Sequence, residues 1–439
     1  MKIIKKVSVV AVSLAMFASA FYFAAAPYLG DGPWEKSLAG VFASESQAAY
    51  TAKLVTNPKK VATYSRMMTD IKQLKAQYPG LVNYSYIGKS LAGVNIPLVT
   101  LGKGPKKILV VAAMHGNEHI TTAQAMYAID NYAYYYAKNK KFNGMDVRRI
   151  LDEVTYYFVP MSNPDGTAIS ISKANAKQKS IAVKTVGGSQ LSQRIKYMSW
   201  KGNARSANLN RNFPANWADQ ESGTRNTKSI DFGGRSGGSE PETKALMKLC
   251  LENEFACMIT THVFGQQLFW KDIYTGNIPG AAKLKDSLKS TTGYKPEYAD
   301  NDRYGGRFEQ WFRYTFNRPA VLIEMMPGGY GLGRSYTNFQ SICWSKTKTA
   351  FLKAADCGSV TTSYRLYFDY NKGSEPKNKP DYKKDVKTGK AVGSLPTPTR
   401  KGYKFDGWYT GKTGGKKYTK ETVYEPNKNT QLYAHWKKI

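Results

Sequence analysis

A continuous apolar run, Lys107–Ala113 with the sequence KILVVAA, constrains the fold more than any other part of the chain. It has the length of a strand and contains β-branched residues, and its lack of polar alternation is typical of a strand covered on both faces. Similar runs recur downstream, separated by helical patterns, at residues 154–159, 256–260 and 320–325. This alternation predicts an α/β fold with a mixed, largely parallel central sheet flanked by helices.

A helix and two strands are predicted before this run. Apolar residues recur there at helical spacing: Tyr64, Met67, Met68, Ile71 and Leu74. The pattern stops at Pro79, where a helix cannot continue. Two short strands are expected next, at residues 82–87 and 94–101, joined by a glycine-rich turn, and a further helix is expected at residues 120–138.

The N-terminal residues have the pattern of an export signal. Lys2, Lys5 and Lys6 precede an apolar run at residues 7–26, with small residues at Ala18 and Ala20 and again near Ala43. A run of about 20 residues is also long enough to span a bilayer, so an uncleaved anchor is the alternative. We expect residues 1–43 to be a signal peptide or an N-terminal anchor, and the protein to be secreted or held at the cell surface.

The charge of the chain indicates an anionic partner. The chain has a net charge of +32. Repulsion among so many positive side chains destabilises a compact state unless an acidic partner lies nearby. The basic residues are scattered through the chain, and no zinc-finger, basic-zipper or RNA-reading signature is present, so we expect no nucleic acid partner. An anionic cell wall fits a charge spread in this way.

The four cysteines lie outside any CxxC motif: Cys250, Cys257, Cys343 and Cys357. In an oxidising compartment they could pair in more than one way. Buried free thiols are an equal alternative, because two of the four lie in apolar helical stretches. The sequence leaves both open.

A polar motif, MHGNEH, follows the first apolar run and places His115 and Glu118 at the carboxyl end of a strand, where an open α/β sheet builds its site. An imidazole and a carboxylate suit zinc, with a third imidazole from elsewhere. The letters also spell HxxEH, the inverted zincin signature. That signature requires a helix, and Gly116 and Asn117 are poor helix residues. We therefore predict His115 and Glu118 as zinc ligands and His119 as a bystander.

Four further motifs follow in order: NPDGT from Asn163, WKGNARSANLNRNFP from Trp200, THVFGQQLFW from Thr261 and VLIEMMPGG from Val321. With MHGNEH, and with YPGLVNYSYIGKSLAG before it, the series resembles the zinc carboxypeptidase (funnelin) family. Within that family it resembles the bacterial branch that cleaves γ-D-glutamyl-diamino acid bonds in peptidoglycan stem peptides. The resemblance covers residues 64–355, and we expect a zinc peptidase domain over residues 55–357.

The resemblance implies a role for each matching residue. His262 matches the third zinc ligand, which gives one zinc ion per chain. Glu324 matches the general base that takes a proton from the attacking water. Arg205 matches the arginine that stabilises the oxyanion. Asn210 and Arg211 match the pair that binds the substrate's carboxylate, for which the planar guanidinium offers two parallel hydrogen bonds.

Some positions depart from the family pattern. Asn208 stands where DLNRNF would have aspartate, which affects the support of the metal shell. Val263 follows the last ligand where serine is usual. The family's mobile tyrosine is Tyr298 or Tyr304, and we favour Tyr304 because it adjoins a glycine pair. Arg307, in the segment that shapes the specificity pocket of relatives, is predicted to meet the side-chain carboxylate of meso-diaminopimelate.

The composition changes after Cys357, and residues 359–439 are rich in Lys, Tyr, Gly and Thr. The stretches LPTPTRKGYKFDGWYT and LYAHW resemble the Listeria-Bacteroides repeat, a small β-grasp-like unit of bacterial surface proteins. The resemblance implies a separate C-terminal module that acts as a spacer or adhesion element, without catalysis. His435, in the closing strand, is predicted to be a half-buried sheet residue.

The sequence therefore predicts a monomeric bacterial zinc metallopeptidase that hydrolyses peptide or isopeptide bonds in cell-wall peptides. One alternative is a general metallocarboxypeptidase that trims C-terminal residues of ordinary peptides. Another is a surface adhesin whose peptidase domain has become a binding module. The three predicted ligands and Glu324 argue against the adhesin.

Overall fold

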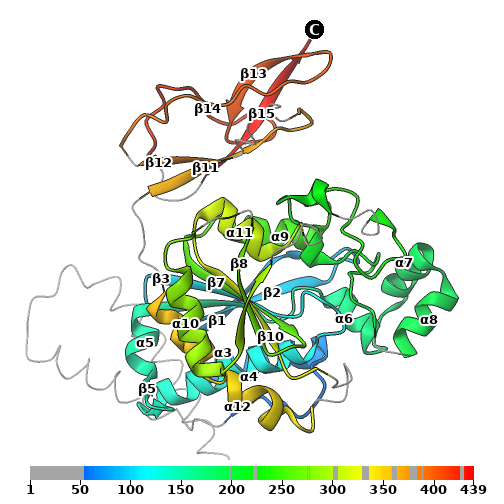
Figure 1. Cartoon of the computed structure of the whole chain (residues 1–439), viewed down its shortest axis with the longest axis vertical. Helices are drawn as coiled ribbons and strands as arrows, with labels where there is room; N and C mark the ends of the chain where they lie inside the picture. The colour runs from blue at the N-terminus through cyan, green and yellow to red at the C-terminus, as the bar shows by residue number, and fades with distance from the viewer. Residues whose placement is uncertain are drawn as a thin grey trace, which may run out of the picture. The chain divides into compact units, whose positions relative to one another are not determined.

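The computed structural model describes residues 54–439 apart from 197–198, 221–224, 274, 276, 300–304, 329–335, 358–362, 375–382, 388 and 426–429 (Figure 1). The predicted signal or anchor segment lies outside the described residues, and so does Tyr304. Within the part of the chain that is described, no helix has both the length and the apolar character needed to cross a membrane.

An eight-stranded mixed sheet forms the centre of the main domain, in the order β1-β2-β6-β3-β7-β10-β8-β9. The strands are β1 Val82–Lys89, β2 Asn95–Gly102, β3 Lys106–Val111, β6 Val154–Val159, β7 Phe255–Val263, β8 Gln267–Asp272, β9 Lys295–Ala299 and β10 Ala320–Met325. The four central strands β6, β3, β7 and β10 run parallel. Antiparallel pairing joins β2 to β6, β1 to β2 and β8 to β10.

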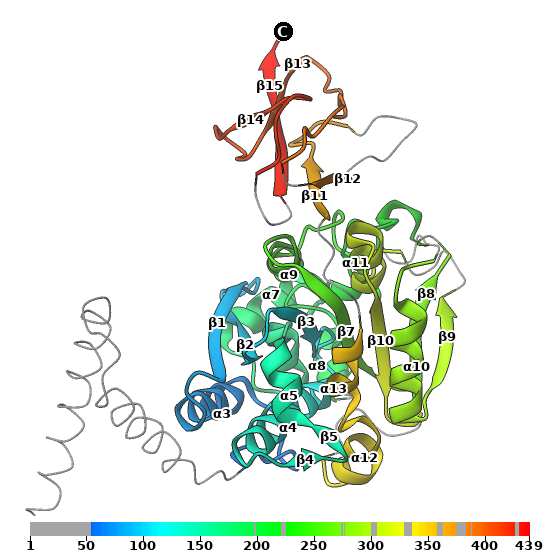
Figure 2. The same ribbon diagram turned by 90° about the vertical axis from the view of Figure 1, so that its left-hand side faces the viewer.

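Helices lie on both sides of this sheet (Figures 1 and 2). They are α3 Tyr64–Gln77, α4 Ile120–Ala137, α5 Val147–Glu153, α6 Pro164–Ser170, α7 Ala176–Val186, α8 Gly188–Lys196, α9 Pro241–Leu251, α10 Ala281–Thr292, α11 Phe308–Phe316, α12 Ser345–Thr347 and α13 Ala350–Lys353. Because both faces are covered, β7 is buried at every position, as its apolar sequence predicts. Short strands β4 Lys141–Phe142 and β5 Met145–Asp146 pair only with each other.

The predicted elements form as the sequence indicates. The apolar stripe of α3 is buried, and the side chain of Thr63 caps the helix by accepting from the backbone N–H of Arg66. The runs at residues 154–159 and 320–325 are strands with those bounds. Strands β8 and β9, at one edge of the sheet, were not predicted.

The parallel strands bring the predicted site residues to one edge of the sheet. Register pairs Val111 of β3 with Thr260 of β7, and Glu324 of β10 with His262 of β7. The loop that leaves β3 therefore emerges beside the end of β7. A site at this edge is the arrangement expected for an open α/β sheet.

The C-terminal module is a separate five-stranded sheet in the order β12-β11-β15-β13-β14. Its strands are β11 Ser363–Asp369, β12 Lys383–Lys387, β13 Tyr403–Tyr409, β14 Lys417–Tyr418 and β15 Thr430–Lys438. Trp408 packs in its apolar core and donates from Nε1 to Pro396 O at 2.7 Å. His435 is half-buried in β15, as predicted, and stacks on Tyr409. The described residues of this module include no helix.

All four cysteines are buried free thiols: Cys250, Cys257, Cys343 and Cys357. Of the two alternatives that the sequence left open, the structure has the reduced one. Burial raises the pKa of Cys343 to about 12, which keeps its thiol protonated.

Candidate active site

The MHGNEH motif forms a loop between β3, which ends at Val111, and α4, which begins at Ile120. The motif is therefore not part of a helix, and the inverted zincin interpretation does not apply. His119 immediately precedes α4, and its Nδ1 lies 2.7 Å from the hydroxyl of Tyr336, on which its ring stacks. It takes no part in the ligand group, as predicted.

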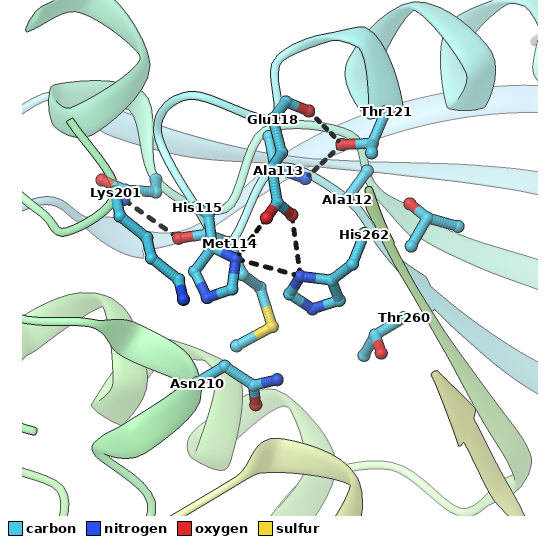
Figure 3. Close-up of polar contacts among 12 residues, drawn as sticks. Ala112, Ala113, Met114, His115, Glu118, Thr121, Lys201, Asn210, Thr260 and His262 are labelled. Atoms are coloured by element: carbon cyan, nitrogen blue, oxygen red, sulfur yellow. Dashed lines mark hydrogen bonds and ion pairs between the residues drawn. The ribbon is translucent and has the colours of Figure 1, made fainter. Parts of the chain in front are cut away.

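His115, Glu118 and His262 converge at the end of the sheet (Figure 3). His115 Nδ1 lies 2.7 Å from Glu118 Oε1, and His262 Nδ1 lies 2.8 Å from Glu118 Oε2. The two Nδ1 atoms are 3.1 Å apart. All three side chains are buried. Three ligand atoms thus meet at one point, although His262 follows His115 by 147 residues.

This donor set fits one zinc ion. Two imidazole nitrogens and one carboxylate are the protein ligands of a catalytic zinc site, which leaves a position open for water or substrate. Ligands held at about 2.0–2.1 Å in tetrahedral geometry lie about 3.3 Å apart, close to the separations seen here. The residues present therefore fit a mononuclear zinc site held by His115, Glu118 and His262.

The charges of the triad support each other. Burial alone would raise the pKa of Glu118, but the facing imidazoles of His115 and His262 outweigh it and hold this pKa well below its ordinary value. Burial lowers the pKa of His115 to about 4. The pKa of His262 is instead raised, because Glu118 outweighs the effect of burial. Glu118 and His115 are thus in the deprotonated forms that bind a metal, and at His262 a metal would compete with a proton.

Thr121 fixes the loop that carries the first two ligands. Its Oγ1 donates to Glu118 O and accepts from Ala113 N, both at 2.8 Å (Figure 3). The side chain is fully buried. This one hydroxyl joins the residue range just after β3 to the start of α4 and so restrains both ends of the loop that carries His115 and Glu118.

Three glycines allow the motif loops to interlock. A Cβ on Gly116 would lie 2.3 Å from the carbonyl carbon of Gly166, and a Cβ on Gly166 would lie 2.2 Å from Gly202 O. Between them, Asn163 Nδ2 donates to Met114 O at 3.0 Å and to Gly202 O at 3.1 Å. The NPDGT and WKGNARS motifs therefore support the metal loop by backbone contact that no larger residue permits.

Glu324 lies beside the triad on β10. Burial raises its pKa to about 8, an effect that His262 opposes and Glu118 increases. Its Oε2 is buried and has no hydrogen-bond partner among the described residues. At this pKa the carboxyl is mostly protonated near neutral pH. The positive charge of a zinc ion held by the triad would lower the pKa toward the deprotonated form that a general base requires.

Arg205 is held in place by the buried carboxylate of Glu240. Its Nε donates to Glu240 Oε2 at 2.7 Å, and its backbone N–H donates to Asn203 Oδ1 at 3.1 Å. Asn203 Nδ2 donates to the same Glu240 oxygen at 2.7 Å. These contacts fix the direction of a side chain that remains 28% exposed.

Asn210 and Arg211 lie in the short 3₁₀ turn η1, Leu209–Arg211. Asn210 Oδ1 accepts from Phe308 N at 2.8 Å, and its Nδ2 lies 3.4 Å from Glu309 Oε2. Arg211 Nη1 donates to Asn210 O at 2.7 Å. The turn is thereby attached to the start of α11, which also carries Arg307 at its N-terminal boundary.

Two of the remaining predicted residues are described. Arg307 is 9% exposed, and its guanidinium lies 5.8 Å from the ring centre of Phe269. Tyr298 is 42% exposed on β9. The favoured Tyr304 lies outside the described residues, so the choice between the two tyrosines stays a prediction.

The structure adds buried polar residues that the sequence interpretation did not single out. Glu309 accepts from Thr260 Oγ1 on β7 and lies next to Asn210. Glu240 supports Arg205. Glu309 had one visible signal, a charge within the apolar sequence FEQWF, whereas Thr260 is hidden in a run that reads as an ordinary buried strand.

Comparisons with known proteins agree with this geometry. The family model "Zinc carboxypeptidase" matches residues 67–330, and the Listeria-Bacteroides repeat domain matches residues 364–435. The gamma-D-glutamyl-L-diamino acid endopeptidase 1 of Lysinibacillus sphaericus is 29% identical over 275 residues, which cover 62% of this chain and 68% of that protein. Bovine carboxypeptidase O is 23% identical over 305 residues, 65% of this chain and 76% of that protein.

A solved structure shares the fold. Bovine thrombin-activatable fibrinolysis inhibitor, in complex with tick carboxypeptidase inhibitor, aligns with a TM-score of 0.52 at 18% identity, over 68% of this chain and 97% of that one. At 18% identity this comparison shows a shared fold and nothing more. The family model covers more than half of the chain, and the His115, Glu118 and His262 ligands are in place. The chain therefore belongs to the zinc carboxypeptidase family, with one zinc site per chain.

Proposed function

We propose that the protein is a peptidoglycan peptidase that hydrolyses the γ-D-glutamyl-diamino acid bond of stem peptides. The observation that carries the proposal is the 29% identity, over 275 residues, to a protein named for that activity. The net charge of +32 supports it, because the peptidase would work close to an anionic cell wall.

Zinc, when bound, acidifies the attacking water and polarises the scissile carbonyl. In the proposed reaction Glu324 takes a proton from the water while the water oxygen forms a bond to the carbonyl carbon. The carbon–nitrogen bond then breaks, and Glu324 returns the proton to the leaving amine. Arg205 stabilises the negative charge that develops on the carbonyl oxygen, because Glu240 already holds its guanidinium in place.

Substrate binding is assigned to the η1 turn and the residues around it. Asn210 and Arg211 would bind a substrate carboxylate, with the mobile tyrosine, Tyr304 or Tyr298, closing over it. Arg307 would meet the side-chain carboxylate of meso-diaminopimelate, since a guanidinium that is 9% exposed binds a carboxylate more strongly than a solvated one does. Arg307→Ala should therefore lower cleavage of diaminopimelate peptides more than that of lysine peptides. An unchanged ratio would exclude this role.

We also propose that the protein acts outside the cell as a monomer, secreted or anchored by residues 7–26, with the C-terminal module as a spacer or adhesion element. The residues at the N-terminus support export by their sequence. The module supports a surface location through its match to the Listeria-Bacteroides repeat domain. Fractionation of cells that express the full chain, followed by detection in medium, wall and membrane, tests this location.

The test of the proposed function is digestion of L-Ala-γ-D-Glu-meso-diaminopimelate peptides beside ordinary C-terminal peptides, with products read by mass. Wild type, Glu324→Ala and, as a control, Glu153→Ala are compared, because Glu153 is an exposed glutamate on α5. Cleavage of the γ-D-glutamyl bond by wild type and the control, but not by Glu324→Ala, supports the proposal.

The same experiment separates the two alternatives. A general metallocarboxypeptidase is favoured by the similarity to bovine carboxypeptidase O, and it would trim only the ordinary peptides. A binding module that has lost its activity would turn over neither substrate while retaining zinc.

A further inference from the structure

The hydrogen bonds around Asn208 extend the zinc site beyond its ligands. Asn208 is fully buried, and its Oδ1 lies 3.0 Å from His115 Nε2. The same oxygen accepts from Asn210 N at 3.0 Å. On the other side, Asn208 Nδ2 donates to Asp231 Oδ1 at 3.0 Å. A carboxylate is therefore connected to a zinc ligand through one amide.

The direction of the Asn208 amide matters for metal binding. Zinc needs the lone pair of His115 Nδ1, so the ring proton has to be on Nε2, where it donates to an oxygen. If the amide were turned by half a rotation, its NH₂ would face both His115 Nε2 and the N–H of Asn210. That orientation would favour the tautomer with its proton on Nδ1, which cannot bind zinc.

Asp231 opposes this rotation. Its carboxylate has acceptors only, so it requires the NH₂ side of Asn208 and leaves the oxygen for His115. Lys201 Nζ, 3.1 Å from the same Asp231 oxygen, holds the carboxylate in place. The negative charge also polarises the amide, which strengthens the hydrogen bond from Nε2–H and makes His115 a more basic ligand.

We propose that Asp231 is a positioning residue of the zinc site: acting through Asn208, it orients His115 and supplies the negative charge that an aspartate at position 208 would supply directly. This role concerns zinc binding, so it does not rest on the proposed substrate. The side chain of Asp231 contacts Asn208 and Lys201, so its effect should appear as a change in zinc affinity.

The test is the zinc affinity of the full chain, measured by competition with a chromogenic chelator of known affinity. Asp231→Ala should weaken zinc binding by about tenfold, the lower end of what the loss of an outer-shell partner costs. Asp231→Asn, which keeps the size but loses the charge, should weaken it less. Asp286→Ala removes an exposed aspartate on α10 and should leave the affinity unchanged.

A charge exchange distinguishes positioning from general stability. In the double variant Asn208→Asp/Asp231→Asn, the carboxylate contacts His115 directly and the new amide donates to it, so zinc affinity should return close to that of the wild type. Unchanged affinity in Asp231→Ala would overturn the proposal. So would a loss that the exchange fails to restore. If Asp231→Ala does not fold, the comparison of Asp231→Asn with the exchange variant decides the question.

Discussion

Glu240 Oε2 accepts a hydrogen bond from Arg205 Nε at 2.7 Å, and the carboxylate is fully buried. This hydrogen bond fixes the guanidinium of Arg205, to which we assign the stabilisation of the oxyanion. Such a group contributes mainly in the transition state, so a loss of its orientation should reduce kcat and leave KM almost unchanged. We expect Glu240→Gln to lower kcat by about tenfold to a hundredfold, less than the loss of a whole oxyanion donor.

The control for this prediction is Glu252→Gln, which changes an exposed glutamate in an ion pair with Lys248. An exposed pair of this kind contributes little, so kinetics and stability should both stay as in the wild type. A rise in KM without a fall in kcat for Glu240→Gln would place Arg205 in ground-state binding of the substrate instead.

Gly116 should not tolerate alanine. The added Cβ would lie 2.3 Å from the backbone of Gly166, and two backbones cannot move apart without disturbing the metal loop. We expect Gly116→Ala to lose zinc and to unfold at a lower temperature. Gly188→Ala is the matched control, because a Cβ there meets nothing within 4 Å. Equal melting temperatures for the two variants would contradict the interlock of the loops.

Thr121→Val keeps the shape of the side chain and removes the hydroxyl that joins Ala113 N to Glu118 O. The buried N–H loses its partner, so we expect the free energy of unfolding to fall by about 1–3 kcal/mol, as measured with urea on the zinc-free protein. In Thr185→Val the lost bond is a local one within α7, from Oγ1 to Ile181 O, and the change should stay within about 0.5 kcal/mol. A smaller loss for Thr121 than for Thr185 would refute this.

Asp130 should make stability depend on pH. Burial raises its pKa from 3.8 to about 6, although Thr56 and Val55 donate hydrogen bonds to it. Because the folded pKa is the higher one, the protonated carboxyl contributes stability that is complete below about pH 4 and is lost as the pH rises through 6. Relative to Asp130→Asn, which stays neutral, wild type should lose about 2 kcal/mol between pH 4 and pH 7.

Urea unfolding of both proteins across this pH range measures the difference. Asp286→Asn, at an exposed position, provides the control and should follow the wild type at each pH. A difference between wild type and Asp130→Asn that is constant with pH, or that has the opposite slope, would show that Asp130 is ionised in the fold without cost.

The sequence predicts the strands that carry the ligands because those strands are buried on both faces and therefore continuously apolar. His115 and His262 follow or end such runs, so their meeting could be anticipated from parallel strand order. The edge strand β9 and its neighbour β8 could not be predicted, since both are partly exposed and their residues, such as Lys295, show no clear alternation.

Contacts between loops were beyond prediction for a related reason. Asp231 lies in a turn without periodicity, and nothing in the sequence connects it to Asn208, which is 23 positions earlier. Asn208 itself was visible as a departure from the family motif, but its effect depends on a partner that only the folded chain supplies. The same holds for Glu240, whose link to Arg205 spans 35 positions.

The distance along the chain between the ligands has a consequence for the order of synthesis. His262 is made 147 residues after His115, so a nascent chain carries two zinc ligands long before the third exists. Tight capture of the metal therefore waits until both halves of the sheet have been made and paired. A complete set of zinc ligands therefore exists only once β7 has been made. A chain truncated before β7 keeps the MHGNEH loop but lacks His262, the third ligand.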